Sequence, residues 1–89
     1  MPERTVVIAS AIGLHARPAS LFARAAADAG VAVTLTNQAG RSVLAASILG
    51  VLSLGVNHGE TVTISADGDG ADVALDALAE LLASDLEKS

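Results

Sequence analysis

One segment of the sequence, from Gly13 to Ser20, combines residue types that could handle an anion such as a phosphate group. His15 stands just before a run of helix-forming residues, which puts its imidazole at the N-cap of the predicted helix. Arg17 follows two residues later, and Pro18 is tolerated in a first turn because the amides there have no intrahelical partner. The amides of Ala16 and Arg17, the positive end of the helix dipole and the guanidinium would converge beside the ring. The segment therefore predicts an anion site next to a histidine.

A histidine in this position suits the reversible transfer of a phosphoryl group. A neutral ring nitrogen is a good nucleophile near pH 7, and the resulting phosphorus–nitrogen bond can be passed on to a further acceptor. The simplest alternative is that His15 is an ordinary polar N-cap and Arg17 a solvated first-turn residue. A hydrolase that used His15 as general base would also need an orienting acid and a substrate cleft, for which so small a chain gives no evidence. On the residues alone, His15 is a candidate nucleophile.

The elements that must position this segment can be predicted from hydrophobic periodicity and turn residues. A stripe of apolar residues at helical spacing predicts the helix after His15, and Gly30 is expected to end it. Alternation with a period of two predicts half-buried strands. In chain order we expect strands at 5–9, 31–36, 41–44 and 61–66 and helices at 16–29, 48–54 and 73–86.

This order, βαββαβα, is typical of an α+β fold in which an antiparallel sheet carries all its helices on one face. The 89 residues are enough for a single domain, so we expect one domain over 1–89. Apolar residues make up 52% of the chain and aromatic residues 1%. The core must therefore be built from aliphatic side chains and Phe22.

Composition excludes several classes of function. The absence of cysteine removes disulfides and thiolate chemistry, and a net charge of −5 without a basic stripe argues against nucleic acid. No apolar run approaches the roughly 20 residues that span a bilayer, and the start of the chain lacks a signal peptide. We therefore expect a soluble cytoplasmic protein without membrane insertion. No glycine-rich phosphate loop followed by lysine occurs, so the chain should not bind ATP itself.

No metal site or cofactor is expected. The acids from Asp67 onward resemble a calcium loop only superficially, because its sixth position holds Asp72 instead of glycine and its twelfth Leu78 instead of glutamate. His58 lies in an Asn-His-Gly turn, far in sequence from the other histidine, and is expected to be a solvated turn residue.

Two stretches resemble a known family. The string GLHARPAS from Gly13 to Ser20 is similar to the active-site signature of HPr, the histidine-containing phosphocarrier of the bacterial sugar phosphotransferase system. The string ASILGVLSLG from Ala46 to Gly55 resembles that family's regulatory serine and the short helix after it. The resemblance, which extends over the whole length, implies an open-faced two-layer sandwich with a four-stranded sheet in the order 1423. It also implies that His15 is phosphorylated through Nδ1, that Arg17 steadies the phosphoryl group and that Pro18 shapes the helix start.

The resemblance further implies the partners. Enzyme I would donate the phosphoryl group, and the IIA domains of sugar permeases would accept it, so the chain would be closer to a substrate than to an enzyme. We expect a monomer. The main rival is a regulatory binding module that keeps the fold but docks to a transcription factor or kinase, and the pairing of His15 with Arg17 argues against it.

A docking face for these partners is expected around the histidine. A two-turn helix cannot bury every apolar residue between Ile48 and Leu54, so some should stay exposed and mark a contact site. The alternative is that four of its five large apolar residues belong to the core. The expected docking residues are Leu14, Ser20, Arg24, Ile48, Leu49 and Leu52, with Arg17 and Phe22 or its neighbours beside them.

Ser47 has two interpretations. It matches the serine that an ATP-dependent kinase phosphorylates in low-GC Gram-positive relatives, where the added charge at an N-cap would repel acidic partners. However, Ala46 stands where those relatives usually have a basic residue, and the composition resembles high-GC members, which often lack the kinase. As a plain N-cap, Ser47 needs no regulatory role.

Overall fold

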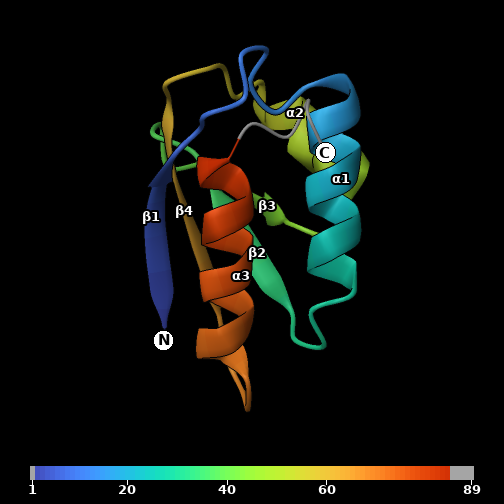
Figure 1. The fold of residues 1–89 in the computed structure, drawn as a ribbon, viewed down its shortest axis with the longest axis vertical. Coiled ribbons are helices and arrows are strands. Elements are labelled where there is room, and N and C mark those ends of the chain that lie inside the picture. The colour runs from blue at the N-terminus through green and yellow to red at the C-terminus, as the bar shows by residue number, and fades with distance from the viewer. Residues whose placement is uncertain (1, 85–89) are drawn as a thin grey trace.

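The structure, a computed structural model, describes residues 2–84 and has two layers (Figure 1). Its elements are β1 (Glu3–Val7), α1 (Ala16–Ala27), β2 (Val33–Thr36), β3 (Ser42–Leu44), α2 (Ile48–Leu54), β4 (Thr61–Ala66) and α3 (Ala71–Ala83). The four strands form one sheet in the order β1-β4-β2-β3, and every neighbouring pair is antiparallel. The helices cover one face of this sheet (Figure 1). The predicted fold class, element order and strand order are confirmed.

The sheet has one apolar face and one hydroxyl-rich face. Along β4 the side chains of Val62, Ile64 and Ala66 are buried, while those between them are half-buried. Thr63 lies opposite Thr5 in β1, and their hydroxyl oxygens are 3.5 Å apart. This alternation is what a strand shows when one face meets the core and the other meets water. The open face of the sandwich therefore follows from the period-two pattern in the sequence.

The helices fill the covered face with aliphatic side chains and a single ring. The predicted stripe of α1 is buried, with Phe22 at its centre. Leu75, Leu78 and Leu82 of α3 are buried in the same cluster. The cluster also contains Val33 and Leu35 of β2, Val62 and Ile64 of β4, and Val51 of α2. One contiguous core therefore supports the elements on either side of His15.

Several predicted boundaries shift. β1 begins at Glu3 instead of Thr5, β2 at Val33 instead of Val31 and β3 at Ser42 instead of Arg41. β1 ends at Val7 instead of Ala9, because its partner β4 begins at Thr61 opposite Val7, and the Ala9 amide donates instead to the Leu82 carbonyl of α3. α1 ends at Ala27 instead of Ala29, and its C-cap is Asp28, so the prediction that Gly30 ends the helix is wrong. Gly30 follows two residues later with φ +81°. α3 begins at Ala71, earlier than its apolar face suggested. The predicted position of Leu86 lies outside the described residues. α2 and β4 have the predicted bounds.

An ion-pair cluster joins the edge strand to the last helix. Arg4 Nε donates to Asp76 at 2.8 Å, and a terminal nitrogen of its guanidinium donates to Asp72 at 3.3 Å. The hydrogen bond to Asp76 raises the pKa of Arg4 above its ordinary value. Asp72 and Asp76 of α3 are therefore partners of Arg4 in β1.

Candidate functional site

His15 occupies the N-cap of α1, as predicted. Its backbone is extended, with φ −125° and ψ 159°, and its side chain makes no capping hydrogen bond to the helix. The residue is half-buried. The first-turn amides of an α-helix have no intrahelical acceptor, and here the N-cap side chain does not supply one.

The loop before His15 is held against the segment before β4. The Leu14 amide donates to the Val56 carbonyl at 2.9 Å, and the Leu14 side chain is fully buried. Gly13 has φ +74°, and a Cβ at this position would lie 2.4 Å from the Val56 oxygen and 2.6 Å from Asn57 Cα. Only glycine fits both the backbone conformation and the space. Gly13 therefore lets two distant segments touch directly beside the histidine.

The His15 ring contacts a residue that the sequence analysis did not select. Nε2 of His15 lies 3.1 Å from Oδ1 of Asn57, 42 positions along the chain. The amide nitrogen of Asn57 in turn lies 3.3 Å from Oε1 of Glu60. Nothing in the sequence pointed to Asn57, since an Asn-His-Gly string reads as an ordinary turn. Only the contact between the two loops brings it to the ring.

The other predicted residues of the anion site lie on the first turn of α1. Ala16 and Arg17 are exposed, and Pro18 is buried. Ala16 has φ +50°, the left-handed region, which costs a non-glycine residue roughly 1–2 kcal/mol. Pro18 costs no hydrogen bond here, because first-turn amides lack intrahelical partners. The strained Ala16 and the rigid Pro18 thus flank Arg17 at the place where the sequence predicted an anion site.

The predicted docking face needs one correction. Leu14 has no exposed surface, and neither has Phe22, because both side chains are in the core. Neither can contact a partner in this fold. The remaining predicted residues are exposed: Ser20 and Arg24 on α1, and Ile48, Leu49 and Leu52 on α2.

The short helix α2 turns most of its apolar residues outward. Leu49 is 77% exposed, and of the large residues of this helix only Val51 is buried. The alternative that four of the five belong to the core is therefore wrong. Ile12, in the loop before His15, is also exposed and was missed by the sequence analysis. Because α2 packs against α1 (Figure 1), an apolar surface lies close to the helix that His15 begins.

Ser47 and His58 both have structural partners. The Ser47 hydroxyl accepts a hydrogen bond from the Gly50 amide at 3.1 Å, which makes it the predicted N-cap of α2. His58 is exposed but is not simply solvated, as its Nδ1 lies 3.0 Å from the carbonyl oxygen of Ser10. A ring nitrogen bonded to a carbonyl is a donor, so His58 is a second link between the two loops.

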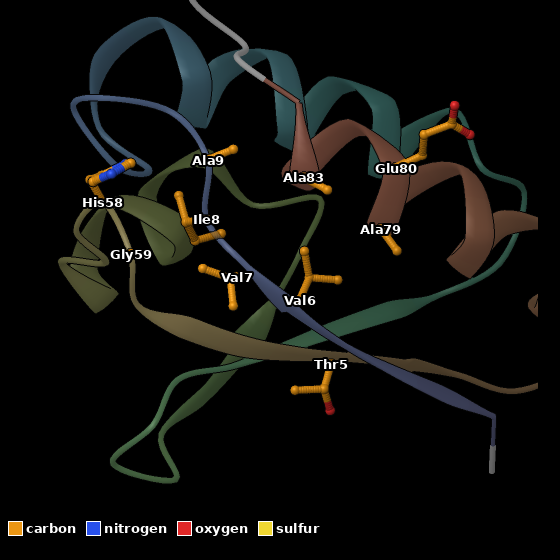
Figure 2. A pocket seen from close by; sticks show the side chains of 10 residues that line it. All are labelled: Thr5, Val6, Val7, Ile8, Ala9, His58, Gly59, Ala79, Glu80 and Ala83. Carbon is orange, nitrogen blue, oxygen red and sulfur yellow. The ribbon is translucent and has the colours of Figure 1, made fainter.

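His15 lines neither of two apolar hollows that open on the described surface. One lies between β1 and α3, with His58 at one end and Glu80 at the other (Figure 2). The other lies between α1 and α3 and is lined by residues such as Ala25 and Val73. Within residues 2–84 no cluster of three side chains could hold a metal ion, and no helix has the length and apolar character to cross a bilayer.

Comparison with known proteins agrees with this geometry. Residues 2–84 match the family model described as PTS HPr component phosphorylation site. Phosphocarrier protein HPr of Streptomyces coelicolor is 50% identical over 99% of this chain and 95% of its own length. Phosphocarrier protein HPr of Haloferax volcanii is 47% identical over 92% and 93% of the two chains. The crystal structure of HPr from Thermoanaerobacter tengcongensis superposes with a TM-score of 0.91 at 38% identity, covering 100% of this chain and 99% of that one.

Proposed function

The chain belongs to the HPr family of phosphocarrier proteins of the phosphotransferase system, and on this premise we propose that His15 accepts a phosphoryl group from Enzyme I. The phosphorylated protein then passes the group to the IIA domain of a sugar permease. In this role the chain is a carrier consumed and regenerated by its partners, and it turns over no small molecule of its own.

The observation that carries the proposal is a half-exposed imidazole at the N-cap of α1 that does not use its own side chain to cap the helix. In the accepting step, the lone pair of Nδ1 forms a bond to phosphorus. The bond between phosphorus and the donor protein breaks, and its electron pair stays with the donor. The added oxygens lie at the positive end of the helix dipole, near the Ala16 and Arg17 amides and the Arg17 charge. The second transfer reverses this step toward the IIA domain.

The exposed residues of α1 and α2 provide a surface for both partners. The apolar side chains of Ile48, Leu49 and Leu52 form a patch on a helix that packs against α1, and Arg24 adds a positive charge from α1 itself. Apolar anchors with a basic rim would fit partners that present apolar and acidic side chains around a phosphohistidine. A single open face would let donor and acceptor bind in turn.

The test is incubation with Enzyme I and labelled phosphoenolpyruvate, followed by measurement of protein-bound phosphate. We expect a phosphoryl group that is labile in acid and stable in base, and that is absent from the His15→Ala variant. The His58→Ala variant is the matched control, because it removes the other histidine and should still be labelled. Protein that stays unlabelled with active Enzyme I would contradict the proposal.

A further inference from the structure

The contact between His15 and Asn57 carries an inference about how the ring is prepared for transfer. The two side chains come from loops 42 residues apart, and their Nε2 and Oδ1 atoms are 3.1 Å apart. The same amide group reaches Glu60, with its nitrogen 3.3 Å from Oε1. Three polar side chains thus form a chain of two hydrogen bonds that ends on the ring.

The chemistry of the three groups fixes the direction of both bonds. An ionised carboxylate only accepts, so Glu60 requires the NH₂ group of Asn57 to face it. The carbonyl oxygen of Asn57 then faces the ring, and because it also only accepts, Nε2 of His15 must carry the proton. A neutral imidazole with a proton on Nε2 has an unprotonated Nδ1 with an available lone pair. The direction of these two hydrogen bonds therefore leaves Nδ1 as the ring nitrogen that can act as nucleophile.

The backbone around Asn57 is held firmly enough to serve this purpose. The Asn57 carbonyl accepts from the Glu60 amide at 3.1 Å, which closes the turn that brings the two side chains together. The Leu14 amide donates to the Val56 carbonyl on one side of Asn57, and the Gly59 amide donates to the Ile8 carbonyl on the other. Asn57 is exposed, so its side chain would have many rotamers without these constraints.

We propose that Asn57, oriented by Glu60, is a positioning residue that holds the His15 ring with Nε2 protonated and Nδ1 open to the incoming phosphoryl group. This inference rests on the proposed function. During transfer Nε2 keeps its proton, Nδ1 forms the bond to phosphorus, and the donor's bond to phosphorus breaks with its electrons retained by the donor. The ring gains positive character, which strengthens the bond from Nε2–H to the Asn57 oxygen. The same contact therefore orients the neutral ring and stabilises the phosphorylated one.

The decisive measurement is the state of the His15 ring nitrogens in two-bond ¹H–¹⁵N spectra, recorded at a pH where the ring is neutral. In the unaltered protein we expect Nε2 to resonate as a protonated nitrogen and Nδ1 as an unprotonated one. In Asn57→Ala both signals should move toward the values of an averaging mixture of tautomers. Asn57→Asp keeps an acceptor oxygen for Nε2 but loses the amide hydrogen that Glu60 accepts, so its signals should stay further apart than in Asn57→Ala without reaching the separation in the unaltered protein. Asn37→Ala, which removes an amide from the turn between β2 and β3, is the matched control and should change neither signal.

The second measurement is the rate of phosphoryl transfer from Enzyme I. Loss of one hydrogen bond to the ring should slow transfer about fivefold in Asn57→Ala, with no such effect in Asn37→Ala. Ring signals that are the same in Asn57→Ala and in the unaltered protein would overturn the positioning role, whatever the transfer rate. Failure of Enzyme I to label the unaltered protein would overturn the proposed function instead, and the ring spectra would still decide the role of Asn57.

Discussion

The contact between Gly13 and the segment before β4 leads to a prediction about stability. In Gly13→Ala, the new Cβ would lie 2.4 Å from the Val56 carbonyl oxygen and 2.6 Å from Asn57 Cα, both backbone atoms that cannot rotate away. The residue would also keep φ near +74°, which costs a non-glycine residue roughly 1–2 kcal/mol. The loops must therefore separate.

The expected loss of stability can be built from these contributions. Separation of the loops removes the hydrogen bond from the Leu14 amide to the Val56 carbonyl, which lowers the free energy of unfolding by about 1 kcal/mol. Poorer packing of the buried Leu14 side chain lowers it by a further ~1 kcal/mol. Alanine also restricts the unfolded chain, which raises the free energy of unfolding by roughly 0.4–1 kcal/mol. When the strain at positive φ is added to these contributions, the free energy of unfolding should fall by about 2–4 kcal/mol. Urea unfolding followed by circular dichroism measures this directly.

Gly40→Ala separates the contact from the backbone strain. Gly40 has φ +86°, and a Cβ there would meet nothing within 4 Å. In this variant the strain at positive φ lowers the free energy of unfolding, and the restricted unfolded chain raises it by a smaller amount. The net decrease should be about 1 kcal/mol. Equal losses in the two variants would refute the argument that Gly13 is required by the approach of the two loops. The His15 ring signals should also shift in Gly13→Ala and stay in place in Gly40→Ala, since only the first moves Asn57 relative to the ring.

Three further variants test other parts of the site. Leu14→Ala should lower the free energy of unfolding by about 2–5 kcal/mol, as expected for a core leucine, and a loss below 1 kcal/mol in urea unfolding would contradict its burial. Leu49→Asp should change stability by less than about 0.5 kcal/mol yet slow transfer from Enzyme I, whereas Val73→Asp, equally exposed but on α3, should leave the transfer rate unchanged. Ser47→Ala should cost about 1 kcal/mol, because α2 loses its N-cap, and unchanged thermal unfolding would argue against that cap.

Most of the fold could be predicted from the sequence because its elements have clear periods and clear ends. Ser47 and Gly55 bound α2 at the predicted residues, and the alternation in β4 fixed both its limits and its buried face. The predicted end of β1 was wrong by two residues. This end is set by the residue at which β4 begins, and the β-branched run of β1 gives no sign of that residue. Such ends are set by the partner strand rather than by local preference.

The site could be predicted only as far as contiguous residues define it. The position of His15 at a helix start followed from the helix-forming residues after it, and the family resemblance gave it a role. The burial of Leu14 was not foreseen, because a residue in a loop next to a half-buried histidine gives no local sign of which way its side chain turns. Asn57 was missed for a similar reason, as its approach depends on Gly13 and on packing between loops 42 residues apart. Contacts of this kind are tertiary and have no pattern in the sequence.

The arrangement of the N-cap explains why a half-buried surface residue can still be held in a defined orientation. A polar N-cap side chain normally turns inward to accept from the second or third amide of its helix. His15 makes no such bond, and its Nε2 contacts Asn57 instead. The positive end of α1 therefore stays without a side-chain acceptor from its own N-cap, while the ring is oriented from outside the helix. Under the proposed function, a phosphoryl group on Nδ1 would supply oxygens where that acceptor is missing. The same ring would then act as the nucleophile before transfer and would anchor a helix cap after it.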